Sequence, residues 1–581
     1  MNLPPRPTPR RPQGFALVMV LVFSGIAITV LSAAMNWTAA NSANNERSVQ
    51  LTITGAAAEA ATEKVLTSIM SDYDNGGEAT VFANLNQYRT RIPTAAENSY
   101  WSNFSFSDAQ GGINANYVQR LQTQTYTNLS GQFAGLFGFA SQYRVISNAR
   151  QTNGRYAITN AIQQELQLAS IPIFQFAIFY NSLLEFSTAA PLTIGGRVHA
   201  NSNLYVGSGS PLTFTTNVTT TRSIDKVAWA GATVASFSGS ISYLGVVSTN
   251  ANSLTLPIGT NNSAAAVREV INPPPAGEAM TSPMGQERFY NKAELQVLVS
   301  NAAVTVRVQT PFDNSPLTIA WSNASYFMTT NLTFTDQREG KTIVTTEIDV
   351  GRFRTWAATN ATVISKLGSG NPPNVLYVAD NRTTTASQLT GIRLKNGQTL
   401  PSRGLTIATP NPLYVLGHYN CTNAAHLGTT NTTSSRPAAI VADALTVLSP
   451  SWTDGASGGA YTSRVAANTT LNAAILAGVV YSTGSSQAAF SGGVHNYPRL
   501  LEAWSGRTLT LNGSIVNLFN SVRAATQFQW PGVYYNAPTR QIYFDQNFMN
   551  VNNLPPGTPQ LRVLIRARWL NPAPGVINYA G

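Results

Sequence analysis

Two short segments that each contain a histidine are the first candidates for chemistry in this sequence. GGRVHAN and GGVHN place His199 and His495 shortly after paired glycines. An imidazole is a good metal ligand, but a zinc site needs three or four ligands at suitable spacing, and neither segment supplies a second one. We expect the glycines to form tight corners and the imidazoles to bond to backbone groups there, so no metal ligand is assigned.

The acidic residues provide two further candidate clusters. DYDNGGE contains Asp72, Asp74 and Glu78, which is part of a calcium-loop pattern, but the regular spacing and the terminal glutamate of the twelve-residue loop are missing. DQREGK (336–341) mixes both signs of charge between strand-like segments. We expect a polar turn without metal for the first cluster, and a solvated turn or local ion pairs for the second.

No catalytic site is predicted. Glycan-active enzymes need at least two carboxylates that face each other. Asp380, Asp443, Asp454 and Asp545 are isolated in the sequence, and Glu185 and Glu502 lie far apart, so no spacing predicts such a pair. No nucleophile elbow, phosphate loop or dinucleotide fingerprint occurs, and the single cysteine, Cys421, is interpreted as a spare thiol. We expect a protein that is not an enzyme and needs no cofactor, with a glycan-active enzyme as the less favoured alternative.

The composition favours an uncharged, β-rich surface. Charged residues make up 10% of the 581 residues, against roughly 25% in a typical soluble domain. The net charge is +11, but Arg6, Arg10 and Arg11 precede an apolar segment and the other positive charges are scattered singly. Because no basic stripe with interleaved aromatic residues occurs, nucleic acid is not an expected partner.

Phe15 to Met35 is an uncharged apolar segment that is long enough to cross a hydrocarbon core of about 30 Å as a helix. Arginines precede it and the first basic residue after it is Arg47, so the positive-inside rule places the N-terminus in the cytoplasm and the bulk of the chain outside. The alternative is a signal peptide cleaved after Ala34, which would release a secreted β-solenoid adhesin or surface protein.

The helix is expected to continue beyond the membrane. No proline occurs between Asn36 and Met70, and apolar residues recur there at near-helical spacing. Gly55 weakens this pattern without breaking it. We therefore predict one helix from Phe15 to Met70, with its first half in lipid and its second half against a head domain.

The boundary between Gly14 and Phe15 resembles the leader of type IV prepilins and pseudopilins, in which a short basic segment ends in glycine and an aromatic residue opens a long apolar helix. The resemblance implies that a prepilin peptidase cuts after Gly14 and methylates the new terminus at Phe15, so the helix is retained. Major pilins carry glutamate as the fifth mature residue, where it pairs with a neighbouring subunit's terminal amine; this chain has Met19 there. That departure implies a minor pilin at a tip, like PilX-like proteins and tip pseudopilins.

The C-terminal part also resembles pilin-related proteins. SGGVHNYPRLLEAWSG (491–506) and APTRQIYFDQNF (537–548) are similar to segments of large pilin-like envelope proteins with PilX-type N-termini. This resemblance implies architecture and location and no particular chemistry.

The rest of the chain is predicted to be mainly β. YRVISNAR (143–150) and RYAITNAIQQELQL (155–168) flank QTNG and predict a hairpin. IPIFQFAIFY (171–180) is too short for a second span and is expected to be a buried strand or packed helix. From about Leu192, short β-like runs broken by Gly, Asn and Pro predict a parallel β-solenoid without a fixed period, with antiparallel β-sandwiches as the alternative. An amphipathic segment (287–300) is expected to pack outside the coils.

The predicted fold class is mainly β with a long N-terminal α-helix and a parallel β-solenoid head. The expected parts are a leader (1–14), a transmembrane segment (15–35), an amphipathic continuation of the helix (36–70), a mixed α/β region (71–170), a first β-solenoid part (171–260), an insertion (261–350) and a second β-rich part (351–581). We expect a minor-pilin-like protein, single-pass in the cytoplasmic membrane with its C-terminal bulk outside, that assembles with other pilins or pseudopilins into a pilus or pseudopilus tip. Its head would contact an extracellular surface or glycan.

Overall fold

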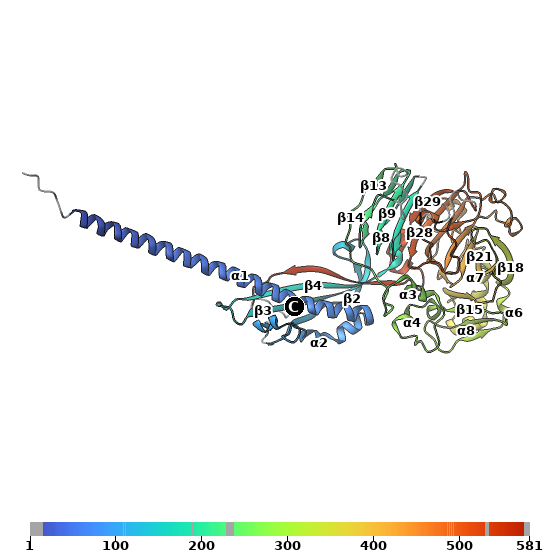
Figure 1. Ribbon diagram of the computed structural model, residues 1–581. Coiled ribbons are helices and arrows are strands. Elements are labelled where there is room, and N and C mark those ends of the chain that lie inside the picture. Colours follow the sequence, from blue (N-terminus) through green and yellow to red (C-terminus); the bar gives the residue numbers. More distant parts are fainter. Residues whose placement is uncertain are drawn as a thin grey trace, which may run out of the picture.

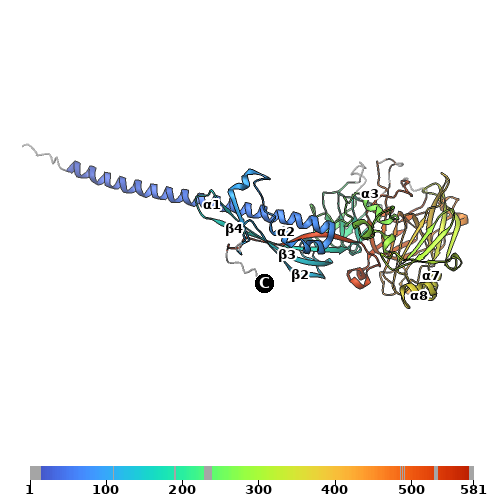
Figure 2. The same cartoon turned by 90° about the horizontal axis from the view of Figure 1, so that it is seen from below.

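The structure is a computed structural model that describes residues 15–108, 110, 112–188, 191–227, 238–484, 486, 489, 491, 493–528 and 534–574. One long helix, α1 (Phe15–Ala83), projects from a small α/β unit, and a large β-rich head follows at the other end (Figure 1). Figure 2 shows the same three parts in a row from below. The predicted fold class, mainly β with a long N-terminal helix, is confirmed.

The small α/β unit, called here the base unit, combines α1 from Gln50 onward with an antiparallel sheet. The sheet has the order β1-β3-β4-β30, with β2 paired to β3. Its elements are α2 (Leu85–Arg89), β1 (Phe104–Ser107), β2 (Tyr117–Asn128), β3 (Phe137–Gln151), β4 (Thr159–Pro172) and β30 (Gln560–Leu570). The predicted hairpin at QTNG is present as β3 and β4, with Arg144 opposite Glu165.

α1 ends later than the expected Met70. Its buried face continues through Tyr73 to Val81, because these side chains still pack against β2, β3 and β4. Gly77 interrupts the helical geometry with φ 73°, a conformation that glycine adopts at little cost. The segment DYDNGGE therefore contains a kink at Gly77 that joins two helical parts of α1, and the first part continues past Met70 into this segment.

The last strand of the chain belongs to the base unit and not to the head. β30 pairs antiparallel with β4, and its alternating residues Leu561, Val563 and Ile565 are buried. The head, residues 173–559, is thus inserted between two neighbouring strands of the base sheet. The expected part 351–581 is therefore divided before β30, which belongs to the base unit. The sequence does not predict this boundary, because alternating apolar residues indicate a strand but not the sheet that it joins.

The first half of the head consists of short strands stacked in parallel. Val198 pairs with Ile178 on one side and with Val218 on the other, and Leu204 pairs likewise with Leu184 and Ile224, so these strands are stacked in steps of twenty residues. The last step is longer, since Leu212 pairs with Ile241 and Val218 pairs with Val247. The strands are β5 (Ile178–Tyr180), β6 (Leu184–Thr188), β7 (Leu192–Ile194), β8 (Val198–Ala200), β9 (Leu204–Ser208), β10 (Leu212–Phe214), β11 (Val218–Thr220), β12 (Ile224–Asp225), β13 (Ile241–Tyr243) and β14 (Val247–Ser248). A fixed step of twenty residues, which was not expected, is thus present up to Ile224 but not in the last step of this half.

The second half of the head adds two larger rows of strands. One row continues the sheet of β5: β28 (Thr508–Asn517), β26 (Thr469–Ala477), β24 (Ala438–Ala442), β22 (Leu405–Ala408), β20 (Val375–Asp380), β15 (Leu295–Val299), β16 (Val304–Val308) and β17 (Leu317–Ile319), with β29 (Thr539–Phe544) beside β28. The other is β18 (Met328–Asp336), β19 (Lys341–Asp349), β21 (Gln388–Lys395), β23 (Pro412–Leu416), β25 (Ala444–Leu448) and β27 (Arg499–Leu500). Pairing is parallel from β5 to β15 and from β19 to β27, unlike the alternating pairing of antiparallel sandwiches. The solenoid winding itself stays a prediction.

The region 261–350 contributes to the sheets as well as to their outside. The amphipathic segment 287–300 forms the short helix α5 and then β15, which pairs with β20 inside the large sheet. The helices of the head are α3 (Ala264–Arg268), α4 (Pro283–Glu287), α5 (Phe289–Lys292), α6 (Trp321–Ala324), α7 (Val350–Thr359) and α8 (Ala361–Leu367).

One buried hydrophobic cluster joins the base unit to the head. Leu129, Phe133 and Ile171 of the base unit lie in the same buried cluster as Phe174 and Phe548 of the head. A shared apolar core resists relative motion, because separating the two parts would expose these side chains to water.

Candidate functional site: the exposed half of the N-terminal helix

The first half of α1 is apolar and exposed around its whole circumference. Every residue from Phe15 to Ser42 is exposed, and no charged residue occurs in α1 before Glu46. The large apolar side chains are Phe15, Leu17, Val18, Met19, Val20, Leu21, Val22, Phe23, Ile26, Ile28, Val30, Leu31, Met35 and Trp37. A helix that is apolar on all faces needs an apolar environment, either a protein core or a membrane. Among the described residues, α1 alone is long and apolar enough to cross a membrane.

The second half of α1 is fixed on the base sheet by small residues. Ala57, Ala58 and Ala61 are fully buried and allow the helix to lie close to the sheet. Gly55 has the same role, since a Cβ atom there would lie 2.8 Å from Nδ2 of Asn160. The glycine that weakened the helix prediction is thus explained by close packing.

Polar side chains add specific contacts between α1 and the sheet. Gln50 Nε2 donates to the Tyr156 carbonyl (2.5 Å), and Gln50 Oε1 accepts from the Tyr156 N–H (3.2 Å). Both carboxylate oxygens of Glu63 accept from Arg566 of β30, at 2.6 and 2.7 Å. Sequence reasoning missed these contacts, because Glu63 and Arg566 are far apart in the chain and no local spacing connects them.

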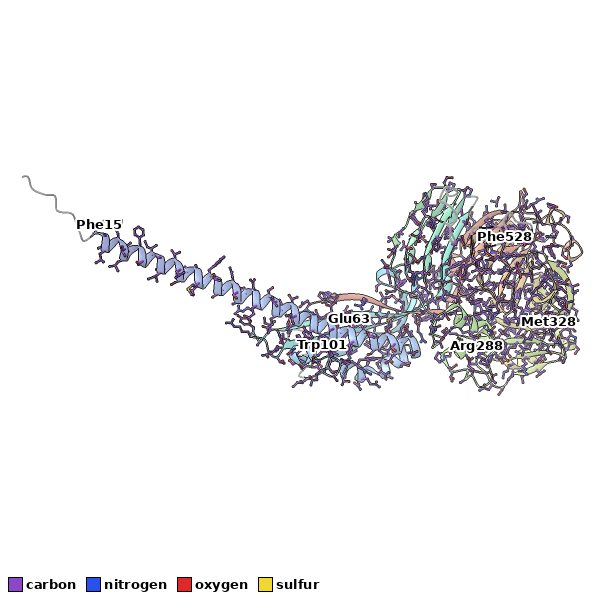
Figure 3. All side chains as sticks on the ribbon, in the orientation of Figure 1. Phe15, Glu63, Trp101, Arg288, Met328 and Phe528 are labelled. Atoms are coloured by element: carbon purple, nitrogen blue, oxygen red, sulfur yellow. The ribbon has the colours of Figure 1, made fainter. Side chains whose placement is uncertain are left out.

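Phe15 and Met19, both named in the sequence analysis, lie at the free end of the helix. Phe15 is its first residue and is 67% exposed (Figure 3). Met19 follows one turn later, so the two side chains share a face. Gly14 lies outside the described residues.

His199 occupies a buried position in the head. Its Nδ1 lies 2.8 Å from Thr219 Oγ1 and its Nε2 lies 2.9 Å from Asn201 Oδ1. The ring therefore bonds to side chains, whereas bonds to backbone groups were expected. Burial lowers the pKa of His199 to about 4, which keeps the ring neutral. The side chain of His495 lies outside the described residues. Across the described part of the chain, no three His, Cys, Asp or Glu side chains are grouped closely enough to hold a metal ion.

The acidic residues of DYDNGGE bond to different partners. Asp72 Oδ2 accepts from Tyr88 OH (2.6 Å) and Asn84 Nδ2 (2.8 Å), whereas Glu78 Oε1 accepts from Tyr143 OH (2.8 Å) and Arg120 (3.1 Å). These carboxylates attach the end of α1 to α2 and to the sheet. They therefore have structural partners.

The segment 336–341 is not a solvated turn. Asp336, Arg338 and Glu339 are 2%, 5% and 9% exposed, and Glu339 pairs with Arg499 at 2.6 Å. Tyr414 OH, on β23 of the same row of strands, donates to Asp336 (2.8 Å). The expectation of local ion pairs is also wrong, since the partners Arg499 and Tyr414 are distant in the sequence.

The isolated carboxylates each have a separate local role. Asp380 pairs with Arg382 (2.5 Å), and Asp454 pairs with Arg393 (2.6 Å). Glu502 accepts from the Ser449 N–H and hydroxyl (both 2.6 Å), and Asp545 caps a 3-10 turn by accepting from the Asn547 N–H (3.1 Å). Cys421 is buried, which raises the pKa of its thiol.

Glu185 is the exception, because it is buried without a full set of partners. It is 1% exposed, Ser482 Oγ donates to Oε2 (3.3 Å), and Oε1 has no hydrogen-bond partner among the residues that the structure describes. Burial raises the pKa of Glu185 to about 7. In the unfolded chain the same carboxyl ionises near pH 4.5. The free energy of unfolding should therefore fall as pH rises from about 4.5 to 7, and stay level above.

Replacing Glu185 with glutamine should remove this dependence. The raised pKa corresponds to about 3 kcal/mol at pH 8. We expect Glu185→Gln to unfold at a higher temperature than wild type at pH 8 and at a similar temperature at pH 4.5. Thermal unfolding of the full chain at both pH values checks this, and an equal shift at both would contradict it.

Comparisons with known proteins give only a distant likeness. No protein-family model matches the chain, and no curated protein matches it. Among solved structures, the chain is similar to the competence-associated pilin ComZ from Thermus thermophilus, with 11% identity and a TM-score of 0.29, over 90% of this chain and 97% of that chain. A likeness of this degree carries no argument about fold or function.

Proposed function

We propose that this chain is a minor-pilin-like structural subunit, anchored in the cytoplasmic membrane by Phe15 to Met35, with the base unit and head outside. It would join other pilins or pseudopilins at the tip of a type IV pilus or pseudopilus. The proposal assigns it no catalytic activity and no cofactor.

One observation carries the proposal: α1 is divided into two halves with opposite surroundings. From Phe15 up to Ser42 every residue is exposed, whereas from Gln50 onward the side chains facing the sheet are buried. This continuity supports a retained anchor, because a cleaved signal peptide has no need to share one helix with the folded part of the protein. The same exposed apolar helix could pack laterally against the helices of other subunits.

The position of Met19 supports a tip location. A carboxylate one turn after the terminal residue could pair with the terminal amine of a neighbouring subunit, and methionine cannot. A subunit with nothing above it has no need of that pair. An accessory role is therefore favoured over a repeating one.

Mass spectrometry of the protein purified from membranes tests the processing step. We expect the mature chain to begin at methylated Phe15, and we expect Gly14→Leu to leave the leader uncut. Gly25→Leu is the matched control, since a Cβ atom at Gly25 meets no atom within 4 Å and the change should leave cleavage intact. A mature chain that begins at Met35 would instead support the secreted alternative.

A further inference from the structure

The end of the head farthest from the apolar half of α1 carries exposed aromatic side chains. α6 and β18 lie at this end in Figure 1, and Met328 marks it in Figure 3, opposite Phe15. Trp321, the first residue of α6, is 40% exposed, and Tyr326, just after α6, is 51% exposed. The end of the molecule that would point outward thus carries two accessible rings.

Polar side chains accompany these rings. Cζ of Arg352 lies 5.8 Å from the centre of the Tyr326 ring, and Arg352 Nη1 donates to the Tyr326 carbonyl (3.4 Å). The Arg352 side chain is 63% exposed. Ser322 and Asn323 are exposed on α6. We call Trp321, Ser322, Asn323, Tyr326 and Arg352 the tip patch.

A rigid aromatic layer holds the tip patch in place. Phe327, next to Tyr326, is buried against Phe353 and Trp356 of α7, with ring centres 5.3 and 4.6 Å apart. The same helix α7 carries Arg352. The backbone at Tyr326 is therefore held by the packing of Phe327 on α7, and Tyr326 is exposed although its neighbour is buried.

The tip patch is poorly suited to a protein partner. The edge strands of the two sheets at this end offer little backbone for pairing with a strand of another protein. β17 has only three residues, and β18 is irregular at Asn331, which has φ 73°. The two half-exposed rings present roughly 200 Å² together. A stable protein interface needs about 800 Å² from each partner.

We propose that the tip patch binds a polysaccharide chain, which deepens the proposed function and rests on it. The flat faces of sugar rings carry C–H groups that pack on Trp321 and Tyr326, while their hydroxyl groups can bond to amide and hydroxyl side chains. Arg352 adds a donor for the carboxylate of an acidic sugar. Single-stranded nucleic acid is less favoured, since it needs a longer basic groove with successive aromatic residues.

The test uses the full chain in detergent micelles and two immobilised polysaccharides, acidic polygalacturonate and neutral dextran. We expect Trp321→Ala and Tyr326→Ala each to weaken retention at least tenfold. Arg352→Gln should weaken binding to polygalacturonate and leave any binding to dextran unchanged. Trp569→Ala is the control, because Trp569 is 51% exposed but lies on β30 in the base unit.

Several results would overturn the proposal. They are no retention of wild type on either polysaccharide, equal losses for Trp321→Ala and Trp569→Ala, or tighter binding of single-stranded DNA through the same residues. The mature N-terminus and membrane association are measured on the same preparations. If these stay as expected while binding fails, only the ligand of the tip patch is wrong and the anchored subunit stands.

Discussion

Asp443→Ala should lower the free energy of unfolding by about 3–5 kcal/mol, because it leaves several buried groups without a partner. Asp443 is fully buried; its Oδ1 accepts from Arg268 Nη2 (2.8 Å) and from the Val522 N–H (2.9 Å). Its Oδ2 accepts from the N–H groups of Arg523 and Ala524, both at 3.0 Å. One carboxylate thus holds α3 and the loop after β28 against the turn between β24 and β25.

Denaturant unfolding of the full chain measures this loss. Asp443→Asn should cost less than Asp443→Ala, because the amide keeps one acceptor oxygen but loses the charge that faces Arg268. Glu46→Ala is a suitable control, since the pair of Glu46 with Arg155 is exposed and worth less than about 1 kcal/mol. A loss for Asp443→Ala no larger than that of the control would show that these contacts do not stabilise the head.

The long helix could be predicted from sequence because its causes are local. The uncharged segment from Phe15 and the near-helical apolar spacing after Asn36 both act within a few residues. The expected end at Met70 is too early, because Gly77 and the polar residues around it are typical of a turn. Their burial depends on strands that follow much later in the chain.

The insertion of the head into the base sheet could not be predicted in the same way. β30 has an ordinary alternating pattern, and only tertiary contacts decide that it pairs with β4. The twenty-residue step between the first strands of the head does have a sequence signal, since Leu184 and Leu204, and likewise Leu192 and Leu212, recur in register. Comparison at a fixed offset would have found it.

Buried charges were the hardest feature to predict. Asp336 and Glu339 look like surface residues because their partners Tyr414 and Arg499 are distant in the chain. Charged residues are seldom buried unless paired, so a cluster of mixed charge is first expected in solvent. The position of Asp443 has the same explanation, since its partner Arg268 is distant in the chain.

Val22→Arg combined with Ile26→Arg should release the protein from the membrane. Both residues lie near the middle of the apolar segment, are 52% and 53% exposed, and share one face of α1. An arginine at the centre of a span costs about 2.5–3.5 kcal/mol, so the pair costs about 5–7 kcal/mol. We expect most of the double variant in the soluble fraction after flotation of membrane vesicles, where wild type stays with the vesicles.

A matched change on the same helix separates anchoring from folding. Val49 is 58% exposed, but it lies beyond the apolar segment, next to Gln50, where the contacts with the base sheet begin. Val49→Arg adds the same side chain without placing it in lipid, so it should leave flotation unchanged. If the double variant floated as well as wild type and Val49→Arg, the exposed half of α1 would not be in the membrane. Its apolar surface would then have to be covered by other subunits alone, which would favour assembly over anchoring as the role of the exposed helix.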